Sequence, residues 1–147
     1  MTMHRRPVGR PRVGAAIGAV VILVGCVLPW WSVGGSANEI TRISGNAFDS
    51  LGIVVFVAAL ATLALVTLPY ARERPVGADR WSSYAAIAAV AWLAFLYRIL
   101  DLAFAQALRF DEPLDVLTRI PGLWVTFIGL AILGRSAFDL WQEPSRR

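Results

Sequence analysis

Apolar residues gather in four long segments, separated by shorter stretches that are rich in polar residues, glycine and proline. The segments cover residues 13–31, 51–68, 81–105 and 120–138. Each is close to the ~20 residues that an α-helix needs to cross roughly 30 Å of hydrocarbon. The pattern predicts an all-α membrane protein. Its four-helix transmembrane domain covers residues 13–141, between polar tails at residues 1–12 and 142–147.

The third segment contains two charged residues within its apolar pattern. Arg98 and Asp101 lie three residues apart, on the helical stripe that includes Tyr84 and Ala91. Charges within the hydrocarbon cost roughly 2.5–3.5 kcal/mol each, so they are usually paired or functional. We expect a structural ion pair; a contact site for a partner subunit, a lipid headgroup or the first loop is an alternative, and a proton or ion path is another. At about 1.5 Å per residue, Arg98 lies roughly 25 Å from Trp81, towards the outer boundary of the membrane.

The polar segments between the spans predict smaller elements. Residues 32–49 form a turn-rich loop with a strand-like stretch at Glu39–Ile43, which favours a small hairpin over the mouth of the bundle. Pro69 is expected to end the second span. Pro113 follows two acidic residues, which predicts a short interfacial helix within residues 111–121.

Arginine is distributed unevenly between the two ends of the spans, and all 14 basic residues are arginine. If the N-terminus is inside, the cytoplasmic segments hold Arg5, Arg6, Arg10, Arg12, Arg72, Arg74, Arg80, Arg135, Arg146 and Arg147. The outer loops then hold only Arg42, Arg109 and Arg119. Because basic residues favour the cytoplasmic side, we expect both termini to lie in the cytoplasm (N-in/C-in).

The sequence also matches itself at an offset of 70 residues, which aligns the first span with the third and the second with the fourth. The match includes Ala15–Ile17 with Ala85–Ile87, and Gly52 with Gly122. It predicts two parallel helical hairpins, related by an axis along the membrane normal. The charged pair of the third span has no counterpart in the first.

Glycine and tryptophan residues indicate how the spans contact their surroundings. The glycines of the first span, which predict a close helix-packing face, are Gly14, Gly18 and Gly25. That face packs either within the bundle or against another protein. The tryptophans predicted to act as interfacial anchors are Trp30, Trp31, Trp81 and Trp141.

The single cysteine, Cys26, allows two interpretations. Leu23–Cys26 matches the lipobox of bacterial lipoproteins, which are cleaved before an acylated cysteine. The apolar run continues to Trp31, however, and favours an uncleaved span with a buried thiol.

Composition excludes several classes of site. One cysteine and one histidine exclude an internal disulfide, a zinc site and a histidine-based triad. The arginines lie at the ends of apolar segments rather than on one soluble face, so nucleic acid is not an expected partner. We expect no cofactor, no bound metal and no enzymatic activity.

Three short motifs point to a known group of proteins. Residues 28–32 (LPWWS) close the first span, residues 48–52 (FDSLG) open the second, and residues 121–124 (PGLW) open the fourth. In these motifs and in architecture the chain resembles the small four-span integral membrane proteins of high-GC actinobacteria, which are mostly of unknown function. The resemblance implies the topology and a bacterial source, and it transfers no functional residue.

Together these observations predict a non-catalytic subunit of a membrane complex. The expected location is the bacterial cytoplasmic membrane, where lipid and other membrane protein subunits are the partners. An accessory or scaffolding role fits the small-residue helix faces. The alternative function is a small oligomeric transporter or channel subunit.

Overall fold

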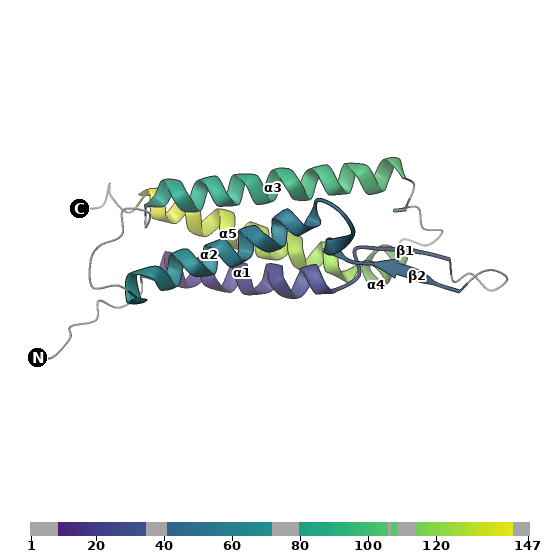
Figure 1. Ribbon diagram of the computed structural model, residues 1–147, viewed down its shortest axis with the longest axis horizontal. Coiled ribbons are helices and arrows are strands. Elements are labelled where there is room, and N and C mark those ends of the chain that lie inside the picture. Colours follow the sequence, from purple (N-terminus) through teal and green to yellow (C-terminus); the bar gives the residue numbers. More distant parts are fainter. Residues whose placement is uncertain (1–8, 35–40, 72–79, 106, 109–113, 143–147) are drawn as a thin grey trace, which may run out of the picture.

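The computed structural model describes residues 9–34, 41–71, 80–105, 107–108 and 114–142. The elements are α1 (Arg10–Val27), β1 (Trp31–Val33), β2 (Ile43–Gly45), the 3-10 helix η1 (Ala47–Asp49), α2 (Gly52–Ala71), α3 (Trp81–Phe104), α4 (Asp115–Arg119) and α5 (Pro121–Gln142). The helices α1, α2, α3 and α5 are long and apolar enough to cross a membrane. They lie side by side along the long axis of the molecule (Figure 1).

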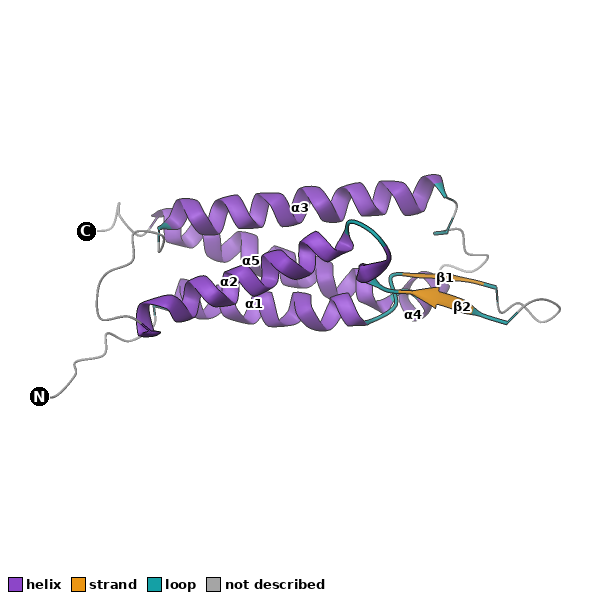
Figure 2. Ribbon diagram, viewed as in Figure 1, coloured by secondary structure: helices purple, strands orange, loops and turns teal. Residues whose placement is uncertain are grey.

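The four long helices form a ring in which each contacts two others. α1 packs most extensively against α5, and α2 and α3 complete the ring between them. The starts of α1 and α3 and the ends of α2 and α5 lie at one end of the bundle, here called the arginine end (Figure 1). The strands, η1 and α4 lie at the opposite end, here called the cap end (Figure 2).

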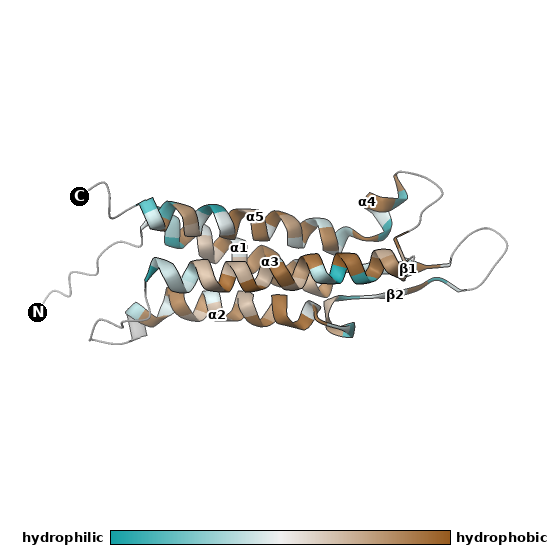
Figure 3. Cartoon of the chain, turned by 90° about the horizontal axis from the view of Figure 1, so that it is seen from above, coloured by the Kyte–Doolittle hydropathy of each residue, from teal (hydrophilic) through white to brown (hydrophobic). Residues whose placement is uncertain are grey.

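The outward sides of the long helices carry many large apolar residues. In α1, for example, Ala15, Gly18 and Ala19 are buried, whereas Ile17 and Val20 are exposed. Exposed apolar side chains on the other long helices include Val57 in α2, Leu93 in α3 and Ile128 in α5. Figure 3 shows the apolar residues extending over most of the length of the bundle. Such surfaces are too apolar for water and are typical of helices in lipid.

The helix ends differ from the predicted spans by a few residues. α1 ends at Val27 rather than at residue 31, because Pro29 cannot continue the helix and the chain then enters β1. α2 continues through Pro69 to Ala71, so the predicted stop at this proline is wrong. A proline in the last turn removes only one backbone hydrogen bond, and membrane helices tolerate that loss.

The hairpin predicted in the first loop is present, and its second strand overlaps the predicted stretch only at Ile43. β1 and β2 are antiparallel, with Trp31 opposite Gly45 and Val33 opposite Ile43. Thr41 is not in a strand, and residues 39 and 40 lie outside the described part of the chain. The bond from Trp30 N to Gly45 O at 2.8 Å continues this pairing by one residue towards the bundle. The fold is therefore mostly helical rather than all-α.

α4 corresponds to the predicted interfacial helix, although residues 111–113 of that prediction lie outside the described residues. Arg119 connects it to the hairpin: its guanidinium binds the Asp115 carboxylate at 2.8 Å and the Gly34 carbonyl at 3.2 Å. Trp124 Nε1 of α5 donates to the Val116 carbonyl of α4 at 3.2 Å. Together, the hairpin, η1 and α4 form a cap over one end of the bundle.

Candidate functional site

The ion pair of α3 lies at the edge of the inward face of the helix. Arg98 Nη1 donates to Asp101 Oδ2, one helical turn further along. The Arg98 side chain is 8% exposed and that of Asp101 is 46% exposed. The guanidinium of the pair is therefore buried, whereas about half of the carboxylate is open to the surroundings.

The predicted stripe of α3 is rotated in the structure. The buried residues are Tyr84, Ala88, Ala91, Phe95, Arg98 and Leu102. Asp101, which was predicted to share the inward stripe, is exposed instead. Phe95 accounts for the rotation: its ring fills the interior, edge-on to Trp30 at a centroid distance of 5.7 Å.

Ring contacts give the position of the pair along the bundle. Trp81 and Trp141 lie 6.4 Å apart at the arginine end, and Phe95 and Phe127 lie 6.5 Å apart further along. Both contacts fit one antiparallel register of α3 and α5, which brings Asp101 level with the first residue of α5. At about 1.5 Å per residue, Asp101 lies roughly 30 Å from Trp81, which equals the usual hydrocarbon thickness. The pair therefore lies in the part of α3 nearest the cap end.

The four predicted tryptophan anchors have different environments. Trp30 is fully buried, and its Nε1 donates to the Gly25 carbonyl at 2.9 Å, so its prediction as a lipid-facing anchor is wrong. Pro29 ends α1 and lets the Trp30 ring fold back over the last turn of that helix. Trp31 is half-buried and donates to Asp49 Oδ2 at 3.1 Å. Trp81 and Trp141 are exposed at the arginine end.

The glycines of the first span all lie against α5. A Cβ atom on Gly18 would lie 2.9 Å from both the Gly129 carbonyl oxygen and the Leu133 nitrogen. Gly25 lies against Thr126, and Gly14 against Ser136. Real Cβ atoms do not approach backbone so closely, so Gly18 and Gly25 require glycine unless the helices separate, whereas Gly14 faces only the Ser136 side chain. The structure thus places the glycine face inside the bundle.

Two buried polar atoms have no hydrogen-bond partner among the described residues. They are Nε of Arg98 and Oγ1 of Thr126. Sequence reasoning singled out Arg98 but not Thr126, because a threonine in an apolar span gives no signal by itself. Cys26 is fully buried on the inward face of α1. The described residues contain no group of three histidine, cysteine or acidic side chains that could hold a metal ion.

Comparison with known proteins finds no matching family model, no matching curated protein and no matching solved structure. The resemblance to small actinobacterial membrane proteins therefore stays a prediction. The architecture establishes the general class, because the four long helices have apolar surfaces on their outward sides. The chain is a multi-span membrane protein.

Proposed function

We propose that this membrane protein is a non-catalytic accessory or scaffolding subunit of a larger complex in the bacterial cytoplasmic membrane. The observation that supports it best is the filled interior of the bundle. Its largest fully buried side chains are Trp30, Tyr84, Phe95, Ile22, Leu130 and Leu133. A bundle that is packed along its axis offers its outward surfaces for interaction, as a scaffold does.

The ion pair fits the same interpretation. Arg98 and Asp101 belong to one helix, so each can neutralise the other without a second helix. Their position near the cap end lowers the cost of the exposed carboxylate, which can contact headgroups and water. We assign the pair a structural role, with Asp101 available for contact at the surface.

The positions of the arginines support a cytoplasmic location of both termini. Arg12 lies at the start of α1, Arg80 directly before α3, and Arg135 in the half of α5 nearer the arginine end. Arg42 and Arg119 lie in the cap. Basic residues favour the cytoplasmic side of a membrane. A fluorescent protein fused to the C-terminus should fluoresce, and alkaline phosphatase fused at the same place should be inactive. The reverse result would contradict this orientation.

The test of the proposed function is the mass of the protein after gentle extraction from its native membrane. An affinity-tagged chain should elute in a complex much larger than its own 16.0 kDa and contain other polypeptides in fixed ratio. A chain that elutes alone as a monodisperse monomer would disprove the subunit function.

The second candidate, a transporter or channel subunit, is favoured by the unpaired buried atoms of Arg98 and Thr126. A polar path would leave such atoms free to bind an ion or water. In reconstituted vesicles with a pH-sensitive dye, the scaffold function predicts no more proton flux than in protein-free vesicles. Flux that is abolished by Thr126→Val in a folded protein would favour the transport function.

A further inference from the structure

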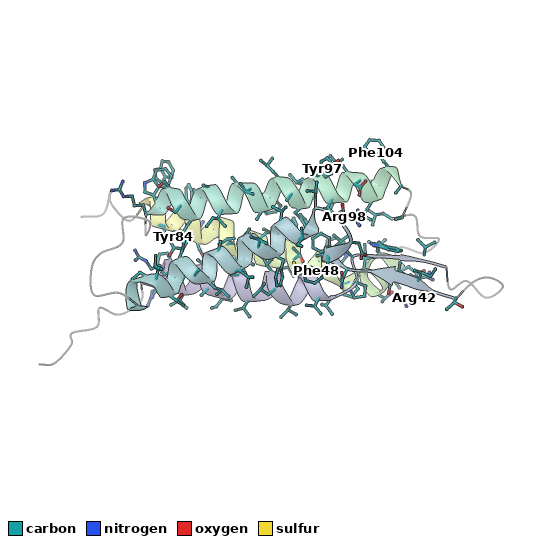
Figure 4. The ribbon with its side chains drawn as sticks, in the orientation of Figure 1. Arg42, Phe48, Tyr84, Tyr97, Arg98 and Phe104 are labelled. Atoms are coloured by element: carbon teal, nitrogen blue, oxygen red, sulfur yellow. The ribbon has the colours of Figure 1, made fainter. Side chains whose placement is uncertain are left out.

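The outward side of α3 has an unusual surface near the cap end. It is formed by Tyr97, Leu100, Asp101 and Phe104, which we call the α3 flank. Their exposed fractions are 56%, 56%, 46% (side chain) and 86%, in that order. In Figure 4, Tyr97 and Phe104 point away from the bundle, whereas Arg98 points towards it. The flank is therefore a separate surface from the buried side of the ion pair.

Phe104 is the last residue of α3 and lies at the cap end of the flank. It follows Asp101 by almost one helical turn, which places it about 34 Å from Trp81 at 1.5 Å per residue. Its ring is the most exposed large apolar side chain of the described residues.

The flank also combines aromatic rings with a negative charge. At the cap ends of the other long helices, exposed side chains such as Val27, Ile53 and Trp124 are uncharged. Among the described residues, Asp101 pairs only with Arg98, and about half of its side chain remains open. Aromatic residues are enriched in the central contacts of protein interfaces, and an exposed carboxylate beside them favours a partner of opposite charge.

We propose that the α3 flank is the docking surface for a helix of a partner membrane protein, which presents an arginine or lysine to Asp101. Tyr97, Leu100 and Phe104 provide the apolar contact, and the charge of Asp101 sets the depth at which the partner helix fits. The inference rests on the proposed function, and it adds the surface and the chemistry of the partner.

The test uses photo-crosslinking in living cells, with benzoylphenylalanine in place of Phe104. Replacement of one aromatic ring by another disturbs the fold little. The same group at Ile17, an exposed position of α1, serves as the control. We expect Phe104 to crosslink to one partner protein, at a peptide next to a basic residue, and Ile17 to give no such product.

Two charge variants separate docking from folding. Arg98→Gln with Asp101→Asn removes both charges and leaves no unpaired ion, so the protein should fold. This double variant should reduce the Phe104 crosslink at least tenfold, because the partner's basic residue loses its counter-ion. Arg98→Gln alone keeps the carboxylate and should keep the crosslink. Asp139→Asn, which removes a similarly exposed carboxylate at the arginine end, should leave it unchanged.

Each other outcome overturns the inference. Crosslinks to lipid alone would mean that no protein covers the flank, and a product of twice the chain mass would mean that a second copy does. An equal crosslink in the double variant would show that Asp101 has no part in docking. If the extracted protein still forms a large complex, only the docking surface is wrong; if it is a monomer, the proposed function is also wrong.

Discussion

The inward faces of α1 and α3 both pack against α5, but they do so with residues of very different size. At an offset of 70 residues, Gly14, Gly18 and Gly25 of α1 correspond to Tyr84, Ala88 and Phe95 of α3. The glycines let α1 approach the backbone of α5, whereas the aromatic rings of α3 fill the space beside α2 and α5. The interface of α1 depends on residues without a side chain, and the interface of α3 depends on large aromatic side chains. Similar apolar spans can therefore build different contacts, and residue size decides which.

The largest effect should come from removing atoms on the α3 side. Phe95→Ala takes away a fully buried ring that contacts Trp30, Trp92 and Phe127. We expect a loss of about 3–5 kcal/mol in the free energy of unfolding, because a cavity remains. Leu96→Ala, at an exposed neighbouring position, is the control and should cost much less. Equilibrium unfolding in detergent measures both, and equal losses would contradict the comparison.

On the α1 side the damaging change is the addition of atoms. Gly18→Ala places a methyl group against the backbone of Gly129 and Leu133. Separation of the helices should cost about 1–3 kcal/mol. In the control Gly134→Ala, the new Cβ would lie 3.5 Å from Trp92 Nε1, an ordinary contact. Its higher helix propensity should make that variant neutral or slightly more stable. A Gly18→Ala protein as stable as the wild type would show that α1 and α5 are not in close contact.

The smallest changes in the free energy of unfolding are expected at two ion pairs. Asp101→Asn leaves the buried Arg98 without its partner and should lower stability by about 1–2 kcal/mol. Addition of Arg98→Gln should recover most of that loss. The pair between Arg135 and Asp139, at 3.4 Å, is exposed. Asp139→Asn should therefore change stability by less than about 0.5 kcal/mol. Urea titrations of the purified variants measure both losses of stability. A larger loss for Asp139→Asn than for Asp101→Asn would contradict the prediction.

Much of the fold could be predicted from the sequence, because each span is long and apolar enough to be recognised alone. The intrahelical pair of Arg98 and Asp101 also followed from local spacing. The burial of Trp30 could not be predicted, since it depends on the space between Gly25 and Phe95. The hairpin likewise pairs residues 31–33 with residues 43–45, a register that local strand propensity did not indicate. Local patterns thus predicted the helices, whereas contacts between residues distant in sequence decided which side chains are buried.

The central claim is that the glycine interface holds the bundle together, while the α3 flank holds the partner. The most direct measurement compares Gly18→Ala with Phe104→Ala by thermal unfolding and by native mass after gentle extraction. Gly18→Ala should unfold at a lower temperature, and its folded fraction should keep the mass of the complex. Phe104→Ala should keep the unfolding temperature of the isolated wild-type chain and appear as the 16.0-kDa monomer. A Phe104→Ala protein that remains in the complex, or that unfolds as early as Gly18→Ala, would contradict the account.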